Sequence, residues 1–223
     1  MIRSLVLVRH GETDANAAGR TIATSDPPLN DRGRVQAARV GQLLAAMEFE
    51  LVTTSPRRRC RETAEAIVAC QNGRTDVVVN DQLVELGLGA FEGRSVSELR
   101  EQGLEEVFLA WRQGAPPRYP PGAESFESAA ERMSEVFDAI VASGVETALV
   151  IGHSHALRIL IASRILGGTP DMHRRLFLDN ASVTSVFWEV AIPRLAMLNG
   201  DVVPTTGVPP IARAVAAASL KLE

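Results

Sequence analysis

The sequence has little of what marks several classes of protein. It contains 2 cysteines in 223 residues, so no disulfide framework is expected. No apolar run is long enough to span a membrane, and the run at the N-terminus is too short for a signal peptide. Positive charge is not in excess, because 23 basic residues stand against 27 acidic ones. These features argue against a disulfide-rich protein, a membrane protein and a non-specific nucleic-acid binder. The expected location is the cytoplasm.

The pattern of apolar residues favours an α/β fold. Short apolar runs of β type are expected strands at 5–8, 51–54, 77–79 and 147–151. Helical periodicity lies between them, in one stretch capped by Asn30 and in two more at 57–70 and 126–140. We therefore predict a three-layer α/β/α sandwich around a mostly parallel sheet, with a β-hairpin at 183–198 on the sheet edge.

The length suits a single domain over residues 1–223. Two short helices are expected between residues 94 and 113, followed by a proline-rich connector. Because this region has too few apolar residues for a core of its own, residues 86–123 are expected to form a small helical cap over the strand ends. Residues 203–223 have a proline-containing lead and an alanine-rich end, and are expected to form a C-terminal tail.

Arg9 and His10 directly follow the first expected strand. Ligands of open α/β sheets collect beyond the carboxyl ends of the strands, so this pair stands where chemistry is usually done. Arginine offers a planar fork for phosphate or carboxylate oxygens, and histidine can be a base, a metal ligand or a nucleophile. The two residues alone fit a catalytic pair and an ordinary surface pair equally well.

Two other segments place charged residues in unusual surroundings. Four arginines, at positions 57, 58, 59 and 61, occupy the first turn of an expected helix, where cations oppose the helix dipole. They indicate either a nearby anion or a solvated basic face. Glu85 lies among apolar residues, so its carboxyl is expected to be desolvated and to stay protonated unless cations counter this; a solvent-exposed Glu at a strand edge is the alternative.

Several motifs together resemble the histidine phosphatase superfamily, the phosphoglycerate mutase-like proteins. The first is Arg9-His10-Gly11-Glu12-Thr13 followed by Asn16, and the second is Ser55-Pro56-x-x-Arg59-x-x-x-Thr63-Ala64. Further matches are Glu85 with the later Glu92-Gly93, and Pro121-Gly122-Ala123-Glu124-Ser125. The resemblance runs from about Leu5 to Ser185 and keeps the family's order.

Two histidines follow the last parallel-type strand, in Gly152-His153-Ser154-His155. The family has an arginine five positions after its catalytic histidine, and Arg158 has this spacing from His153. The resemblance therefore implies that His153 is catalytic and that His155 lines the pocket or lies behind it. Ser154 stands where the family usually has glycine, which implies a backbone without positive φ at this position, or some strain.

The resemblance assigns roles to the remaining residues. His10 is the expected nucleophile, and Glu85, protonated at the start, is the expected proton donor. Arg9, Arg59 and a protonated His153 are expected to bind the phosphoryl oxygens, with Asn16 and Ser154 as further substrate-binding residues. No cofactor and no metal are expected, because the arginines would do the work of Mg²⁺ and would repel a cation.

The expected function is that of a metal-independent histidine (acid) phosphatase, which hydrolyses a small phosphorylated metabolite through a phosphohistidine. A phosphoglycerate mutase would use the same residues, but such mutases carry a Tyr-Gly pair after the acid residue, and Tyr119 is the sole tyrosine here. A third alternative is a phosphoester-binding protein without turnover. The presence of both His10 and Glu85 argues against it. No nucleic-acid or membrane partner is expected, and a homodimer is left open.

Overall fold

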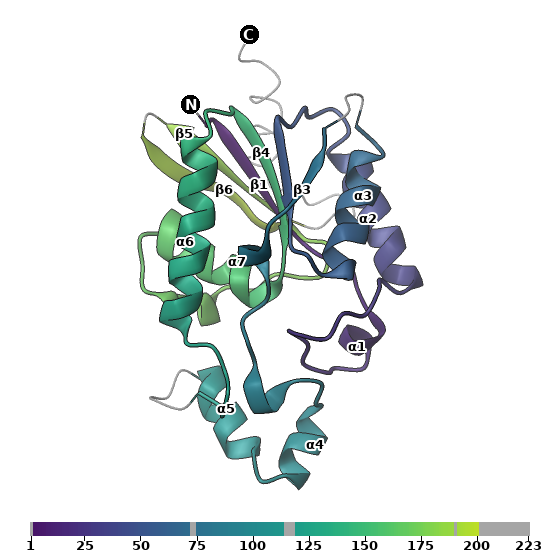
Figure 1. The fold of residues 1–223 in the computed structure, drawn as a ribbon, viewed down its shortest axis with the longest axis vertical. Helices are drawn as coiled ribbons and strands as arrows, with labels where there is room; N and C mark the ends of the chain where they lie inside the picture. The colour runs from purple at the N-terminus through teal and green to yellow at the C-terminus, as the bar shows by residue number, and fades with distance from the viewer. Residues whose placement is uncertain (1, 72–74, 114–118, 190, 201–223) are drawn as a thin grey trace.

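A six-stranded sheet runs through the middle of the structure (Figure 1). The computed structural model describes residues 2–71, 75–113, 119–189 and 191–200. The strands are β1 (Ser4–Arg9), β2 (Leu51–Thr54), β3 (Val77–Val79), β4 (Thr147–Gly152), β5 (Val183–Glu189) and β6 (Ile192–Gly200). Their order is β3-β2-β4-β1-β5-β6; the first four strands in this order are parallel, β5 is antiparallel to β1, and β6 is antiparallel to β5. The predicted α/β class and the terminal hairpin are confirmed, with β5 beside β1 and β6 at the edge.

Helices cover both faces of the sheet, as Figure 1 shows. The helices α6 (Phe126–Ala142) and α7 (Ser154–Leu160) pack on one face, and α2 (Asp31–Leu43) and α3 (Arg58–Val68) on the other. Successive residues of a strand point to opposite faces, so Leu5 and Leu7 of β1 join the core under α6 and α7. Val6 and Val8 join the core under α2 and α3. A strand buried on both faces explains the continuous apolar run at 5–8.

Two helix starts are stabilised by local acceptors. The side chain of Asn30 accepts a hydrogen bond from the Gly33 N–H at 2.8 Å, as its predicted N-cap role requires. Helix α3 has no side-chain cap of its own, but the Asp26 carboxylate accepts from the Arg58 N–H at 2.6 Å. The anion indicated by the arginine-rich first turn is, at this position, an aspartate of the protein itself.

The segment after β3 forms a helical layer at the end of the molecule opposite the start of β1 (Figure 1). It contains 3₁₀ turns at Asp81–Leu83 and Gly89–Phe91, then α4 (Val96–Glu101) and α5 (Glu105–Gln113), which confirms the two short helices. Phe91 packs edge-to-face on Phe108 and Trp111, with ring centroids 5.3 and 5.7 Å away. These rings share one buried cluster with Phe126 and Ile159, so this layer packs onto α6 and α7.

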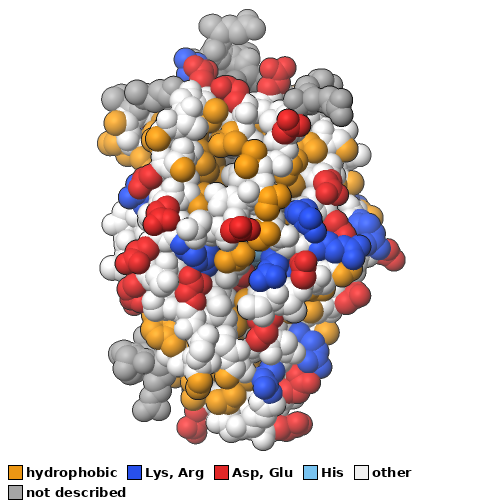
Figure 2. Space-filling view, in the orientation of Figure 1, with side chains coloured by type: hydrophobic (Ala, Val, Ile, Leu, Met, Phe, Trp, Pro, Cys, Tyr) orange, Lys and Arg blue, Asp and Glu red, His pale blue; other side chains and the backbone are white. Residues whose placement is uncertain are grey.

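Shorter elements complete the described chain. They are α1 (Asp14–Ala17), a π-helical turn at Ile161–Ile165 and a 3₁₀ segment at Pro170–Arg175. The expected tail, 203–223, and the connector residues 114–118 lie outside the described residues. Within the described chain, no helix combines the length and the hydropathy needed to cross a membrane. Figure 2 shows acidic and basic side chains interspersed over the face seen there.

Candidate active site

The carboxyl ends of three neighbouring parallel strands, β2, β4 and β1, meet at one edge of the sheet. The pairing continues past the strand ends, since the His10 N–H donates to Gly152 O at 3.0 Å and the Ser55 N–H to Ile151 O at 3.1 Å. This register sets the His10 ring against the His153 ring, edge-on, with centroids 5.3 Å apart. The two predicted histidines, 143 positions apart in the chain, therefore form one cluster.

Gly11 is required by a close approach of two backbone segments. A Cβ on Gly11 would lie 2.6 Å from Gly33 O at the start of α2, and a Cβ on Gly33 would overlap Glu12 O. Gly11 is not among the residues with positive φ, so close packing and not an unusual turn explains the glycine. The Gly11 N–H donates to Thr63 Oγ1 at 3.1 Å, and this hydroxyl donates to Arg59 O at 2.7 Å. The His10 loop is thus tied to the helix that carries Arg59.

His10 is held in one tautomer. Its Nδ1 lies 2.7 Å from Gly11 O, so Nδ1 carries the proton and Nε2 keeps its lone pair. Burial, and then the electrostatic influence of the neighbouring His153, Arg9 and Arg59, keep the pKa of His10 well below its ordinary value. The ring is therefore neutral at pH 7, which is the form that a nucleophilic imidazole requires.

Each of the two predicted arginines keeps a buried Nε–H donor that no described residue uses. Arg9 Nη1 donates to Leu178 O at 2.6 Å, and Arg59 donates through Nη1 to Ser25 O at 2.8 Å and through Nη2 to Ala23 O at 3.3 Å. The Nε–H groups of both arginines are buried and have no hydrogen-bond partner within the described chain. Buried donors of this kind are rare and are normally satisfied by a ligand, an ion or water.

His153 is fully buried, with 0% of its surface exposed. Its Nδ1 accepts from Arg59 Nη2 at 3.3 Å, and its Nε2–H donates to Ser55 Oγ at 2.8 Å. Burial lowers the pKa of His153 to about 3, so the ring is neutral here and not protonated as the sequence led us to expect. Cys60 packs 3.5 Å from Nε2, and burial raises the pKa of its thiol to about 12, so it is a neutral packing residue.

Glu85 is 8% exposed, which rules out the solvent-exposed alternative. Its Oε1 accepts from the Leu86 and Ala156 N–H groups, both at 2.9 Å, and its Oε2 from the His155 N–H at 3.1 Å. Burial by itself raises the pKa of the Glu85 carboxyl, but the His155 ring, the neighbouring His153 and the hydrogen bond from the Ala156 N–H outweigh it. The pKa lies well below its ordinary value, contrary to the protonated state that we expected.

A pocket of about 430 Å³ opens beside this cluster. The predicted residues on its wall are Arg9, His10, Asn16, Glu85 and Ser154, whereas Arg59 and His153 are next to His10 in the cluster and do not line the pocket. Ser154 is the first residue of α7 and has no positive φ, as its replacement of glycine implied. Most of the remaining wall is apolar or cationic, including Leu88, Phe108, Trp111, Phe177, Arg20, Arg112, Arg158, Arg174 and Arg175, and it also contains Thr21, His155 and His173.

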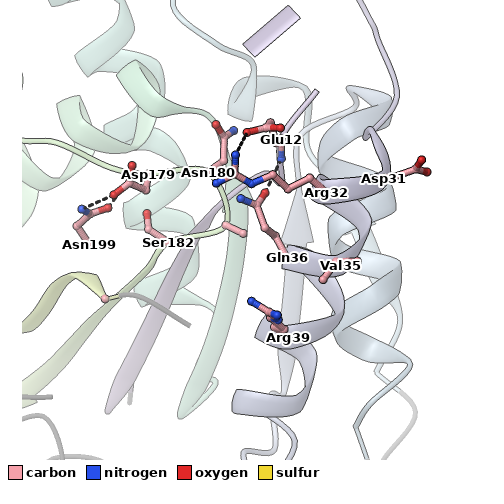
Figure 3. A pocket seen from close by; sticks show the side chains of 12 residues that line it. Glu12, Asp31, Arg32, Val35, Gln36, Arg39, Asp179, Asn180, Ser182 and Asn199 are labelled. Atoms are coloured by element: carbon pink, nitrogen blue, oxygen red, sulfur yellow. Dashed lines mark hydrogen bonds and ion pairs between the residues drawn. The ribbon is translucent and has the colours of Figure 1, made fainter. Parts of the chain in front are cut away.

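A second pocket, of about 590 Å³, is lined by Glu12, by residues of α2 and by the loop before β5 (Figure 3). Two of its carboxylates have a partner on the same wall: Glu12 lies 3.3 Å from Arg32, and the amide of Asn199 donates to Asp179 at 3.1 Å. None of the four histidines of the chain lines it. Although this pocket is larger, the chemically competent groups are in the smaller one.

Sequence reasoning missed the loop before β5. Asn180 Nδ2 donates to His10 O at 3.1 Å and lies 3.3 Å from Asn16 Oδ1, so it connects two predicted site residues. The Ala181 N–H bonds to His10 O at 3.1 Å, and Ala181 has a φ of 57°, an unusual conformation for alanine. This loop follows no periodic pattern and falls in none of the motifs, so the sequence carried no signal for it.

Histidines and arginines therefore lie together at the carboxyl ends of the parallel strands. This arrangement places positive charge around a nucleophile, as phosphoryl transfer requires. The family model of the histidine phosphatase superfamily (branch 1) matches residues 5–201, and the chain belongs to this superfamily.

Named relatives within the superfamily include both mutases and phosphatases. The chain is 36% identical over 206 residues to a probable phosphoglycerate mutase GpmB of Cronobacter sakazakii, covering 90% of this chain and 91% of the relative. Among solved structures, it is similar to a putative alpha-ribazole-5'-P phosphatase of Escherichia coli, with a TM-score of 0.78, 25% identity and coverage of 92% and 100%. It is also similar to the mycobacterial glucosyl-3-phosphoglycerate phosphatase Rv2419c, solved with VO3, with a TM-score of 0.77, 25% identity and coverage of 89% and 99%.

Proposed function

We propose that this protein is a phosphomonoester hydrolase that works through a phosphohistidine at His10, acting on a small phosphorylated metabolite. One observation carries the proposal. The His10 ring is neutral, Nδ1 is held by Gly11 O, and the ring lies beside Arg9 and Arg59, whose buried Nε–H groups lack a partner in the described chain. A phosphoryl group bound in the pocket would give the nucleophile its target and Arg9, which lines the pocket, an acceptor, while Arg59 would add its positive charge from beside His153.

In the first step, Nε2 of His10 attacks phosphorus while the bond to the ester oxygen breaks in line. Phosphoryl transfer asks mainly for positioning and for positive charge around the equatorial oxygens, which Arg9 and Arg59 would supply. The amide of Asn16 and the first turn of α7 at Ser154 lie on the same wall as neutral donors. The departing alkoxide takes a proton from Glu85, so that the alcohol leaves uncharged.

In the second step, water attacks the phosphohistidine and gives a proton to the Glu85 carboxylate. The P–N bond breaks, neutral His10 is regenerated and inorganic phosphate leaves. His153 contributes at the phosphoryl oxygens once it carries a proton. A phosphate dianion beside it would raise its pKa, opposing the burial that keeps the ring neutral. Two cationic arginines in the site favour a reaction without a divalent metal, because they provide the charge that Mg²⁺ would otherwise supply.

Phosphoglycerate mutase is the second candidate, and the name of the relatives at 36% identity favours it. One structural observation favours the hydrolase. The hydroxyl of Tyr119, the sole tyrosine of the chain, accepts from the Phe126 N–H at 3.2 Å and lies 3.1 Å from Glu127. Tyr119 is not on the wall of the pocket, so it does not stand in for the tyrosine that the mutases carry near the acid residue.

The test follows the phosphoryl group. The protein is first given p-nitrophenyl phosphate and a set of radiolabelled phosphorylated metabolites, and the reaction is quenched in alkali. We expect inorganic phosphate to be released and an acid-labile label to appear on the protein. Both should be absent in His10→Ala and present in His173→Ala, a control that removes a different histidine of the pocket wall. Label on serine, or activity surviving in His10→Ala, would refute the mechanism. Interconversion of phosphoglycerates faster than phosphate release would assign the mutase function instead.

A further inference from the structure

His155 is the histidine for which the proposed reaction has no role. It lies in the first turn of α7, on the wall of the catalytic pocket, with its ring 5.3 Å from Trp111 and 5.8 Å from His173. Its Nδ1 is buried and makes no hydrogen bond to any described residue. The nearest carboxylate oxygen is Glu85 Oε2, at 3.5 Å. A small rotation of the ring would turn this approach into a hydrogen bond.

Glu85 is otherwise held only by backbone. The N–H groups of Leu86, Ala156 and His155 donate to its two oxygens. All of these groups would remain if the His155 side chain were removed. The side chain is therefore the one adjustable contact between the proposed proton donor and the described residues around it.

The charged groups that face this pair come from several elements. Arg59 of α3 and His153 after β4 act on Glu85, and Arg9 of β1 and Arg158 of α7 act on both Glu85 and His155. His173, on the far side of the His155 ring, keeps its Nδ1 at 2.8 Å from Pro170 O and does not contact Glu85. None of these groups touches Glu85 as directly as the His155 ring does.

We propose that His155 is a positioning residue for Glu85. The N–H group at Nδ1 of His155 donates to Oε2 of Glu85 and keeps the carboxyl ionised in the free enzyme. The proton for the leaving group therefore arrives with the substrate. This inference rests on the proposed role of Glu85 as the proton donor. A phosphomonoester monoanion enters, and its P–O–H proton passes to Glu85. The same proton then passes to the departing oxygen as the P–O ester bond breaks. Glu85 is a carboxylate again; it accepts a proton from the attacking water in the second step and passes it to the phosphate that leaves, so the free enzyme is restored with Glu85 ionised.

The electrostatics agree with this arrangement. Burial lowers the pKa of His155 and Glu85 raises it, with a net decrease, so the ring is neutral at pH 7 and can donate from Nδ1 as a neutral tautomer. Burial alone would raise the pKa of Glu85, and the His155 ring is the first of the groups that reverse this effect. Without the ring, the pKa of Glu85 moves back toward or above its ordinary value.

The experiment measures the ionisation of Glu85 directly. The infrared band of its protonated carboxyl is titrated with pH and assigned by its loss in Glu85→Gln. Four proteins are compared: the wild type, His155→Leu, His155→Asn and His173→Leu. His155→Asn keeps an N–H donor near the position of Nδ1, and His173→Leu is the matched control, which removes a histidine from the same wall. Circular dichroism checks that each variant is folded.

We expect the titration of Glu85 to move to higher pH by about one unit in His155→Leu, the lower end of the effect of one charged or hydrogen-bonded neighbour. His155→Asn should recover at least half of the shift, and His173→Leu should titrate like the wild type. The acid limb of kcat/KM for an alkyl phosphate, where Glu85 takes up a proton in the free enzyme, should move in the same direction. An unchanged Glu85 titration in His155→Leu, or an equal shift in His173→Leu, would overturn the inference even if the protein is a phosphatase. If the wild type hydrolyses no phosphomonoester, the proposed function fails, while the infrared titration still decides the His155–Glu85 contact.

Discussion

Glu92 offers a strong test of how this site is supported, because it acts on Arg59 through a turn. Its Oε2 accepts from the Ala23 N–H at 2.8 Å, and its Oε1 accepts from the N–H of Thr24 at 3.1 Å and from the N–H and Oγ of Ser25 at 3.0 and 2.9 Å. The carbonyls of Ala23 and Ser25 are the groups that hold the Arg59 guanidinium. Losing the carboxylate therefore loosens both the turn and the arginine.

The expected loss of stability follows from these four hydrogen bonds. A hydrogen bond contributes about 1 kcal/mol net, and the partial exposure of Glu92 reduces its share. We expect Glu92→Ala to lower the free energy of unfolding by about 2–3 kcal/mol. Glu92→Gln keeps an acceptor and loses only the charge, so it should cost about 1 kcal/mol. Both variants should raise KM more than they lower kcat, because Arg59 is proposed to bind the phosphoryl group.

The stabilising effect of Glu92 should depend on pH. Burial raises the pKa of Glu92, but the hydrogen bonds from Ser25 and Ala23 outweigh it and the net shift is downward. A carboxyl with a depressed native pKa stabilises the fold above its unfolded pKa of about 4.3, and this contribution is lost as the pH falls through the native value. Urea unfolding at pH 7 and below pH 4 should show the gap between wild type and Glu92→Gln closing in acid. A gap that stays constant, or a Glu92→Ala variant as stable as the wild type, would show that Glu92 does not hold the turn.

Three further outcomes are expected. EDTA should leave the rate unchanged while vanadate or excess phosphate inhibits, and a loss of activity that a divalent metal restores would contradict the arginine-based site. Glu85→Gln should slow single-turnover phosphorylation from alkyl phosphates far more than from p-nitrophenyl phosphate, whose leaving group needs no proton; equal slowing would remove Glu85 from the role of acid. His153→Ala should lower kcat by about 10²–10³-fold, the usual effect of losing one transition-state donor, whereas His155→Ala should lower kcat far less. The reverse order would mean that the spacing to Arg158 does not identify the catalytic histidine.

Much of the fold could be predicted because it depends on local patterns. Buried strands are apolar throughout, helices repeat every 3.6 residues, and Asn30 caps the helix that follows it. The position of Arg9 and His10 at a strand end follows from the same pattern. The loop at Asn180 could not be predicted, because its contacts to His10 cross 170 positions of sequence and follow no periodicity.

In the candidate site, too, some features follow from the sequence and others from the folded structure. The sequence by itself determined which chemical groups are present and in what order they meet the strand ends: His10 with Arg9, Arg59 in the first turn of a helix, and His153 after β4. Only the tertiary structure decided their protonation. Glu85 was expected to be a buried acid and His153 a cation, yet both pKa values lie below their ordinary ranges. The reason is physical: a pKa depends on burial and on partners such as the Ala156 N–H, 71 positions from Glu85, and only the folded chain brings these groups together.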